Sequence, residues 1–375
     1  MTTTATTSTT TSAAASGPRP ADRSGPVLAG SAGPLLDAHD TLLLDLDGVV
    51  YVGPDAVPHA PAALAAAREA GVRLAYITNN AARTPDVVAA HLRELGAPAD
   101  DDDVVTSAQA AARHLAATLA PGSPVLLVGG RGLRVALTEV GLRPVDSLAQ
   151  EPAAVVQGFS PDIGWKLLAE ATHAVRSGLP WTASNLDRTV PTPGGPAPGN
   201  GLLVELVAAA AGRRPGTVCG KPERALFDEA VRRTGARSAL VVGDRLDTDL
   251  QGARTAGLPG LLVLTGVTGV AELVAAAPHE RPTAVAHDLR GLRAEHPGPE
   301  VGGDASAVTA RCRDARVEVA DGVLRVVSSA PGPDGLDVLR AGAEACWWTA
   351  DTGAPLDPDA AAAVLREHVA VGTGS

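Results

Sequence analysis

A short apolar run that ends in two acidic residues is the feature that most constrains the fold. The run is Leu42–Leu44, and Asp45, Asp47 and Gly48 follow it closely. A short apolar run bounded by a turn signal is typical of a fully buried strand in a parallel sheet. Ligands of such sheets bind beyond the carboxyl ends of the strands, so Asp45 is expected where chemistry takes place. Two neighbouring carboxylates repel each other, and hard oxygen ligands suit Mg2+, so the pair predicts a bound cation.

The composition allows two or three domains in 375 residues. Hydrophobic residues make up 45% of the chain but aromatic residues only 2%, so Ala, Val and Leu are expected to fill the core. The net charge of -11 argues against nucleic-acid binding. It does not exclude an anionic substrate, because a bound metal and local basic groups set the field in a site.

The cysteines and the N-terminal segment bear on the compartment. Cys219, Cys312 and Cys346 are widely spaced and form no C-x-x-C pair, which predicts neither a disulfide framework nor a zinc site and favours a reducing, cytoplasmic compartment. No apolar run reaches the roughly 18 residues that would span a membrane. Residues 1–37 are rich in Thr, Ala, Ser, Pro and Gly and lack the pattern of a secretory signal. We expect a disordered tail there, with the true start codon left open.

Strand and helix signals alternate in two separate stretches of the chain. In the first, a strand is expected at 72–78 and helices at 60–70, 84–95 and 107–119. In the second, a helix is expected at 224–234 and strands at 238–242 and 260–265. Such alternation is typical of a parallel sheet. The two stretches, residues 38–121 and 217–292, are therefore expected to form one core.

The block between these stretches, residues 122–216, is long enough for a domain of its own. It has expected strands at 125–128, 154–157 and 181–184, expected helices at 132–140, 163–177 and 202–211, and a Pro- and Gly-rich loop at 191–201. After a linker at 296–305, a hairpin of strands 316–320 and 323–328 precedes a helix at 335–346. This pattern predicts a small α+β appendage at 306–375 that carries no catalytic constellation.

Polar residues that follow the core strands are expected to meet at one edge of the sheet. They are Asp45, Asp47, Thr78, Asn79, Lys221, Asp244 and Asp249. Such a set can transfer a phosphoryl group through a covalent aspartyl phosphate: a carboxylate attacks phosphorus, a cation offsets the repulsion, and a lysine stabilises the equatorial oxygens. Lys166 and Lys221 are the only lysines against 29 arginines, so Lys221 is expected at a site that needs a compact charge.

The segments that carry these residues resemble the four motifs of the haloacid-dehalogenase superfamily. They are DLDGVVY at 45–51, TNN at 78–80, GKP at 220–222 and GDRLDTD at 243–249. Their order and the long insert after the second motif resemble the NagD-like subfamily with a type IIA cap, also called a C2-type cap. That subfamily includes actinobacterial glycerol-3-phosphate phosphatases with a C-terminal extension. The resemblance covers about residues 38–292 and implies an α/β fold, with a Rossmann-like parallel-sheet core, an inserted α/β cap and the small appendage.

The resemblance implies a role for each matching residue. Asp45 is implied as the nucleophile and a Mg2+ ligand. Asp47 is implied as the general acid and base, which binds the metal through its backbone carbonyl. Asp244 is implied as a side-chain ligand, Asp249 as a residue that orients metal-bound water, and Lys221 as a phosphate ligand. The rest of the implied phosphate and substrate loop is Thr78, Asn79 and Asn80.

The inserted cap is expected to close over the site and to select the substrate. Its loop at 185–191 resembles the cap loop of the family, and Asn185, Asp187 and Arg188 are candidates for substrate contact; a hydrogen-bonded turn is the alternative. The few aromatic residues offer little to stack on a ring, so a small polar phosphate such as glycerol 3-phosphate is the first expectation. Phosphoglycolate, pyridoxal phosphate and a sugar or nucleotide monophosphate stay open as alternatives.

Functions of other classes are weighed against this one. A non-catalytic phospho-ligand sensor is disfavoured by the intact acidic and lysine motifs, and a phosphotransferase would need an added acceptor. The expected partner is a small phosphorylated metabolite, with neither nucleic acid nor a membrane, and a homodimer is left open.

Overall fold

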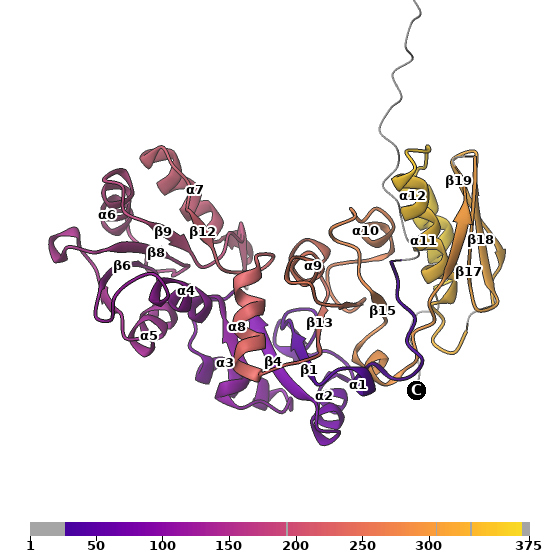
Figure 1. The fold of residues 1–375 in the computed structure, drawn as a ribbon, viewed down its shortest axis with the longest axis horizontal. Coiled ribbons are helices and arrows are strands. Elements are labelled where there is room, and N and C mark those ends of the chain that lie inside the picture. Colours follow the sequence, from indigo (N-terminus) through magenta and orange to yellow (C-terminus); the bar gives the residue numbers. More distant parts are fainter. Residues whose placement is uncertain (1–26, 193, 305, 331, 370–375) are drawn as a thin grey trace, which may run out of the picture.

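The computed structural model describes residues 27–369, except residues 193, 305 and 331. Its larger sheets define three parts of the molecule (Figure 1). The core sheet lies in the middle, and the unit of residues 124–218 projects to the left of it in Figure 1. The C-terminal unit, from residue 300, packs against the core on the right.

The core sheet is six-stranded and parallel, with the strand order β15-β14-β13-β1-β4-β5. Its strands are β1 (Thr41–Leu44), β4 (Arg73–Thr78), β5 (Val104–Thr106), β13 (Ala239–Gly243), β14 (Gly260–Val263) and β15 (Ala284–Ala286). In β1, Leu44 is in register with Val242 on one side and Tyr76 on the other. Two stretches separated by the inserted unit therefore form one sheet, and the predicted fold class is confirmed.

Side chains of β1 alternate between two hydrophobic clusters, because successive residues of a strand point to opposite faces. Leu42 and Leu44 pack with the helices α2 (Ala60–Glu69) and α3 (Pro85–Glu94). Leu43 packs on the other face with α4 (Ser107–Ala116), α8 (Arg224–Thr234) and α9 (Gln251–Ala256). Cover on both faces explains why all three residues from Leu42 to Leu44 are apolar.

The inserted unit is built on a second parallel sheet, with the strand order β12-β9-β8-β6-β7. Its elements are β6 (Pro124–Val128), α5 (Arg131–Glu139), β7 (Arg143–Val145), η2 (Leu148–Gln150), β8 (Ala154–Gln157), α6 (Trp165–Arg176), β9 (Trp181–Ala183), α7 (Asn200–Ala211) and β12 (Thr217–Val218). One face of the sheet packs on α6 and α7. The other face joins α4, α5 and α8 in one cluster, so the inserted unit and the core share buried apolar surface.

Two details of the inserted unit differ from the sequence expectations. Residues 217 and 218, expected in the core, pair with β9 and so belong to the sheet of the inserted unit. The expected loop at 191–201 contains most of a two-stranded ribbon, β10 (Thr189–Thr192) with β11 (Gly195–Pro198). The ribbon buries no apolar face, so it leaves no hydrophobic period in the sequence.

The C-terminal unit is an antiparallel sheet covered by two helices. Its elements are β16 (Glu300–Gly303), β17 (Ala307–Cys312), β18 (Ala315–Ala320), β19 (Val323–Ser328), α11 (Asp337–Asp351) and α12 (Pro358–Arg366). The predicted hairpin is confirmed as β18 and β19. The predicted linker at 296–305 is wrong in part, because β16 lies within it and pairs with β17. The sequence expectations lacked β17, although its residues alternate between buried and exposed.

This C-terminal unit shares a hydrophobic cluster with the core. Leu262 and Val285 of the core sheet pack in the same cluster as Leu339 and Trp347 of α11. The nearly buried Arg281 donates to both carboxylate oxygens of Asp351, at 2.7 and 2.8 Å, and its guanidinium lies 5.3 Å from the Trp347 ring centroid. A paired, stacked guanidinium fixes the unit on the core at this contact.

The end of the predicted tail is ordered, and for residues 27–37 that prediction is wrong. The backbone N–H groups of Val27 and Leu28 donate to Oε1 of Glu344 at 2.6 and 2.5 Å, and the Leu28 side chain is buried. Ser31 donates its N–H to the carbonyl of His296 at 2.7 Å. The short helix α1 (Leu35–Ala38) then leads into β1. Residues 1–26 of the predicted tail lie outside the described residues.

The remaining elements are short and lie between those above. They are β2 (Tyr51–Val52), β3 (Asp55–Ala56), η1 (Asp101–Asp103), the π-helix η3 (Leu246–Leu250), α10 (Val270–Val274) and η4 (Leu289–Arg293). Within the described part of the chain, no helix has both the length and the apolar character needed to cross a membrane. The three cysteines are buried and free there.

We expect Glu344→Ala to destabilise the protein by about 1–3 kcal/mol, because one buried and one half-buried N–H group of the N-terminal arm lose their acceptor. The urea midpoint of unfolding, followed by circular dichroism, should fall. The matched control Glu367→Ala removes an exposed carboxylate from the same unit and should change stability by less than about 0.5 kcal/mol. Equal midpoints for the two variants would show that the arm does not depend on Glu344.

Candidate active site

The candidate site lies at the carboxyl edge of the core sheet, where β1, β4 and β13 end side by side. Asp45 follows β1 directly and donates its backbone N–H to the carbonyl of Val242 at 2.9 Å. Thr78 ends β4, and Asp244 follows Gly243, the last residue of β13. Because neighbouring parallel strands end at the same edge, three distant sequence segments meet here, as predicted.

A glycine turn carries the chain away from Asp45. Gly48 has φ +84°, in the left-handed region that favours glycine. A Cβ atom at Gly48 would lie 2.5 Å from Oδ2 of Asp244. After the turn, β2 and β3 form a small antiparallel flap, and Thr265 donates its hydroxyl to the Gly48 carbonyl at 2.5 Å. The turn thus places the chain against Asp244 without a side chain between them.

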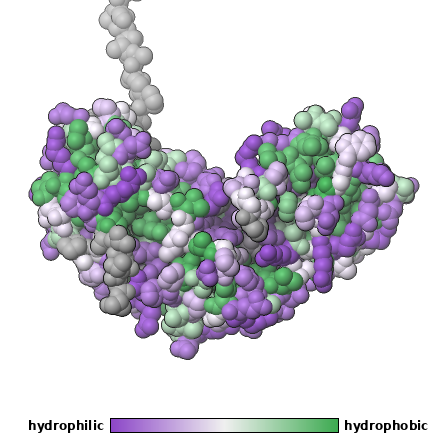
Figure 2. Space-filling view, turned by 180° about the vertical axis from the view of Figure 1, so that it is seen from behind, coloured by the Kyte–Doolittle hydropathy of each residue, from purple (hydrophilic) through white to green (hydrophobic). Residues whose placement is uncertain are grey.

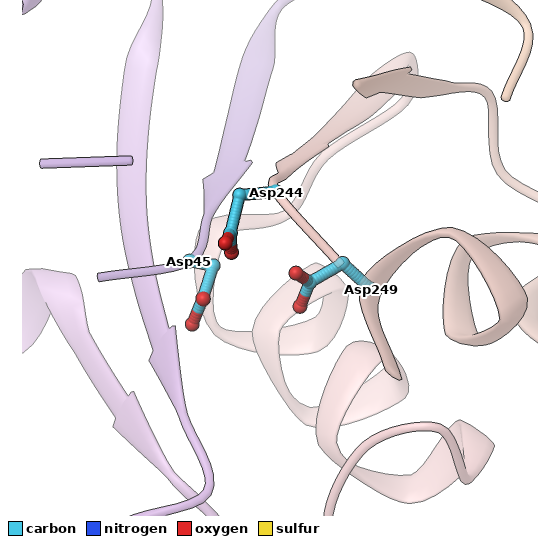
Figure 3. Close-up of side chains that lie close together, drawn as sticks. All are labelled: Asp45, Asp244 and Asp249. Carbon is cyan, nitrogen blue, oxygen red and sulfur yellow. The ribbon is translucent and has the colours of Figure 1, made fainter. Parts of the chain in front are cut away.

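Three carboxylates gather at this edge, those of Asp45, Asp244 and Asp249. Each offers one oxygen, and these oxygens lie within 4.8 Å of one another. Figure 3 shows that they come from separate elements: Asp45 from the end of β1, Asp244 from the end of β13 and Asp249 from the helical turn that follows. Asp249 lies in η3 and accepts a hydrogen bond from the N–H of Arg245 at 3.1 Å.

The ammonium group of Lys221 sits among these carboxylates. Nζ donates to Oδ1 of Asp45 at 2.5 Å and to Oδ1 of Asp249 at 2.7 Å. The side chains of Lys221 and Asp249 are almost completely buried, and that of Asp45 is only 13% exposed. Lys221 is predicted to lie beside Asp45, and it forms ion pairs with both Asp45 and Asp249.

Burial and mutual repulsion raise the pKa values of the three carboxyl groups. For Asp45, burial raises the pKa and Lys221 opposes the rise. Burial and the Asp249 charge raise the pKa of Asp244 to about 6, and burial and the Asp45 charge raise that of Asp249 to about 6. Burial alone would lower the pKa of Lys221, but Asp249 and Asp45 outweigh it and raise that pKa. One lysine thus faces more negative charge than it can neutralise.

The donor atoms at this edge fit a hard divalent cation. Val267 donates its N–H to Oδ2 of Asp244 at 2.6 Å, whereas Oδ1 of Asp244 is buried without a hydrogen-bond partner among the residues that the structure describes. A buried carboxylate oxygen without a partner is costly, and coordination of Mg2+ would satisfy it. The Asp47 side chain lies outside this cluster, and coordination by its backbone carbonyl stays a prediction.

Asp47 lies at the solvent side of the site. The residue as a whole is exposed, but the protein around its carboxyl group removes part of the water and so raises its pKa. The charges of Lys221, Arg83 and His91 oppose this rise. A carboxyl group with a raised pKa carries its proton over a wider pH range, as a general acid must.

The three residues of the expected phosphate loop have different surroundings. Thr78 is buried, and its hydroxyl accepts from the N–H of Asn80 at 3.1 Å. The exposed Asn80 accepts from the N–H groups of Ala82 and Arg83 at 2.9 and 3.1 Å, which closes a turn. The Asn79 side chain contacts the Lys221 backbone and Asp187. Phosphate contact by this loop stays a prediction.

The expected cap residues also separate. Asn185 is buried and donates to the carbonyl of Asn79 at 2.7 Å. Asp187 is half-buried and accepts from Nδ2 of Asn79 at 3.0 Å; burial raises its pKa despite that bond. Arg188 is exposed and pairs with Glu205 at 2.6 Å, on the surface of the inserted unit. Of the three cap residues, Asn185 and Asp187 therefore contact the core, and Arg188 has no such contact among the described residues.

Sequence reasoning assigned no role to two glycines and one backbone donor that shape the site. A Cβ at Gly266 would lie 2.0 Å from Oδ2 of Asp244, and a Cβ at Gly243 would lie 2.2 Å from Cβ of Asp249. Val267 follows Gly266 and donates to Asp244. A glycine next to an acidic motif is a usable signal at Gly243, but the 264–268 loop carries no motif that points to the site.

Two family models match the chain, one over the first part of the core and the start of the inserted unit and the other over the second part of the core. One, described as haloacid dehalogenase-like hydrolase, matches residues 42–143, and one described as HAD-hydrolase-like matches residues 218–292. Together with the relatives below, they show that the chain belongs to the haloacid-dehalogenase family of hydrolases. The predicted membership is thus confirmed, and the chain is an enzyme of the phosphatase class.

The similar proteins and solved structures are phosphatases. The chain is 47% identical over 311 residues to the D-glycerol 3-phosphate phosphatase of Mycobacterium tuberculosis. The match covers 81% of this chain and 84% of that protein. The crystal structure of a glycerol phosphate phosphatase from Mycobacterium tuberculosis in complex with magnesium has a TM-score of 0.78 and 44% identity, and the match covers 90% of this chain and 99% of that one. The p-nitrophenyl phosphatase from Archaeoglobus fulgidus has a TM-score of 0.63 and 28% identity, over 68% of this chain and 98% of that one. The predicted resemblance to NagD-like phosphatases is confirmed.

We expect Gly266→Ala to weaken Mg2+ binding about 10–100-fold, the cost typical of disturbing the residues that support a metal ligand. The new Cβ would overlap the Asp244 carboxylate and force it to move. Calorimetric titration with MgCl2 measures the effect. The control Gly216→Ala adds a Cβ with no atom within 4 Å and should bind Mg2+ as the wild type does. Unchanged affinity in Gly266→Ala would remove Asp244 from the metal site.

Proposed function

We propose that this protein is a Mg2+-dependent phosphomonoester hydrolase that works through a phosphorylated Asp45. The observation that carries the proposal is the contact of Lys221 with both Asp45 and Asp249, beside the buried oxygen of Asp244. A carboxylate, a fixed cationic donor and a site for a divalent cation are what phosphoryl transfer to an aspartate requires.

Asp45 acts as the nucleophile. Its carboxylate lies at the end of a rigid central strand, with one oxygen held by Lys221, so its direction is set before the substrate binds. Lys221 then stabilises the negative charge on the transferring phosphoryl group, because it already lies 2.5 Å from the attacking carboxylate. The Thr78 hydroxyl and nearby backbone N–H groups supply further donors.

Asp47 acts as general acid and then as general base. It lies two residues from the nucleophile on the solvent side of the site, where the leaving alcohol departs and water enters. Its raised pKa favours the protonated form that gives a proton to the leaving oxygen. After the alcohol leaves, the same carboxylate accepts a proton from the attacking water.

Asp45 and Asp244 would hold the Mg2+ ion through their carboxylates, with the Asp47 carbonyl as a further ligand. Bound there, the ion would neutralise the phosphate charge that otherwise repels Asp45. Asp249 lies close enough to orient ligands of the ion, and its bond to Lys221 keeps the lysine in place.

Glycerol 3-phosphate is the proposed substrate. The support is the likeness to a D-glycerol 3-phosphate phosphatase, which extends over most of both chains. The site is entered between the inserted unit and the core, where Figure 2 shows a notch with hydrophilic residues on both sides. The inserted unit acts as the cap, and Asp187 is its proposed contact residue for a polar substrate. Phosphoglycolate, pyridoxal phosphate and a sugar or nucleotide monophosphate are the alternatives.

The wider setting is also a proposal. Three buried free cysteines, all within the described residues, support a reducing cytoplasmic compartment. The negative net charge supports a metabolite rather than a nucleic acid as the partner. A homodimer stays open.

We expect Asp45→Asn to lower kcat on the order of 10⁴-fold or more, since an amide cannot replace the attacking carboxylate. Asp47→Asn should lower kcat less, by about 10²–10⁴-fold, because it removes only the proton transfer. Far-UV circular dichroism should be unchanged in both variants. The control Asp102→Asn changes an exposed carboxylate and should keep the wild-type rate. A near-normal rate in Asp45→Asn would refute the covalent mechanism.

We expect phosphate release from glycerol 3-phosphate to stop on addition of EDTA and to return with excess MgCl2. A panel of phosphomonoesters with kcat/KM for each should rank glycerol 3-phosphate first. A higher kcat/KM for another compound would replace the proposed substrate but keep the reaction class. No turnover on any compound, with Mg2+ present, would favour the sensor alternative.

A further inference from the structure

Three chain segments meet beside the site at a junction between the core and the cap. The first is Asn79 at the end of β4, the second is the cap loop from Ser184 to Asp187 after β9, and the third is Gly220 with Lys221, where the chain returns to the core. The segment that carries the catalytic lysine is thus also the segment that leaves the cap.

The side-chain amide of Asn79 holds the backbone of Lys221 from two sides. Its Oδ1 accepts from the N–H of Lys221 at 2.7 Å, and its Nδ2 donates to the carbonyl of Lys221 at 3.2 Å. A paired contact of this kind fixes both the position and the orientation of one residue's backbone. The Lys221 side chain starts from this backbone and ends between Asp45 and Asp249.

The same asparagine is tied to the cap. Its Nδ2 also donates to Oδ1 of Asp187 at 3.0 Å, and its carbonyl accepts from Nδ2 of Asn185 at 2.7 Å. Asn185 is fixed in turn, because its carbonyl accepts from Nδ2 of the buried Asn200 at 2.7 Å, at the start of α7. The contacts therefore run from a cap helix through the cap loop to the lysine.

The junction leaves no spare room. A Cβ at Gly220 would lie 2.5 Å from Oδ1 of Asn79, 2.7 Å from the Ser184 carbonyl oxygen and 2.8 Å from Cβ of Asn185. Each of the three segments is represented in this contact. A shift of the cap loop would consequently press on the residue next to Lys221.

Resting on the proposed function, we propose that Asn79 is a positioning residue that couples the cap loop to the catalytic Lys221. Its amide has two N–H bonds, and both are used, one by Lys221 and one by Asp187. Its side chain therefore holds the lysine where the nucleophile needs it, and the phosphate is left to Thr78 and Lys221. When the cap loop moves away from the core, Asp187 leaves Asn79. Asn79, which holds the backbone of Lys221, then loses one of its hydrogen bonds.

The two lysines of the chain give a test that does not depend on turnover. Protein labelled with 13C-lysine has two side-chain signals, from Lys221 and from the exposed Lys166 on α6, and Lys166→Arg assigns them. In Asn79→Ala the Lys221 ε-CH2 signal should move toward the Lys166 position. The matched control is Asn80→Ala, because the Asn80 side chain accepts from the N–H groups of Ala82 and Arg83 and has no hydrogen bond to Lys221 or the cap loop among the described residues, so the Lys221 signal should stay in place.

Kinetics separate positioning from phosphate binding. In Asn79→Ala, kcat should fall on the order of 10²-fold with KM within about threefold of the wild type, since misplacement of a catalytic group by about 1 Å costs that much. The exchange of Asn79→Asp with Asp187→Asn restores a donor and acceptor between the two positions. It should recover at least about tenfold of the kcat lost in Asn79→Asp alone.

The outcomes decide the proposal. An unmoved Lys221 signal in Asn79→Ala, or a loss expressed only in KM, would overturn it and return Asn79 to the phosphate loop. Failure of the exchange to improve on Asn79→Asp would remove the link to the cap. If the wild type hydrolyses no phosphomonoester, the proposed function fails on its own, and the Lys221 signal still decides whether Asn79 holds the lysine.

Discussion

The ammonium group of Lys221, held between Asp45 and Asp249, is the interaction on which the rest of the site depends. Three carboxylates, two buried and one half-buried, each have an oxygen within 4.8 Å of the others and repel strongly, and one lysine offsets only part of that charge. Breaking a buried pair by removing one partner typically costs about 3–5 kcal/mol, so each member holds the others in place. The uncompensated charge, with an Asp244 oxygen that has no hydrogen-bond partner among the described residues, supports the proposal of a divalent cation at this edge of the sheet.

The position of the inserted unit in the chain bears directly on the contact between Asp45 and Lys221. Asp45 and Lys221 are 176 residues apart, and the inserted unit lies between them. The parallel pair β1 and β13 places Asp45 beside Asp244, because both strands end at one edge. Lys221 lies between β12 and α8, where the chain re-enters the core, and its side chain reaches Asp45 from there. The cap is thus inserted directly between two parts of the catalytic group, and its return to the core passes through Gly220. Motion of the cap and placement of the lysine share one short segment.

Much of this arrangement could be predicted from the sequence, because it leaves local signals. The Leu42–Leu44 run predicts a central strand. Asp45 lies three residues before Gly48, and Lys221 and Asp244 directly follow glycines, in short motifs. Asp45 and Asp244 follow core strands, and the geometry of a parallel sheet brings these two together. Lys221 is expected at a core strand end too, but it follows β12 of the inserted sheet. The same reasoning separates core from cap, although it misplaces β12 by two residues.

Other features could not be predicted, since they depend on contacts between distant segments. Val27 and Leu28 are a weak apolar signal in a polar tail, and the contacts that order them, with Glu344 and with the hydrophobic cluster of the C-terminal unit, come from distant segments. The ribbon of β10 and β11 has no buried face to create a period. Asn79 looks like its neighbour Asn80 in the sequence, yet one contacts the lysine and the cap while the other closes a turn. In the same way, no sequence motif around Val267 predicts that its N–H donates to Asp244.

The most direct test of the account is chemical trapping of the phosphorylated residue. Enzyme mixed with Mg2+ and glycerol 3-phosphate is quenched and reduced with borohydride, which converts an aspartyl phosphate to homoserine, and the peptides are analysed by mass spectrometry. The account predicts homoserine at position 45, dependent on substrate, with Asp47, Asp244 and Asp249 unchanged. Reduction at one of those three instead, or at no carboxylate during active turnover, would contradict it.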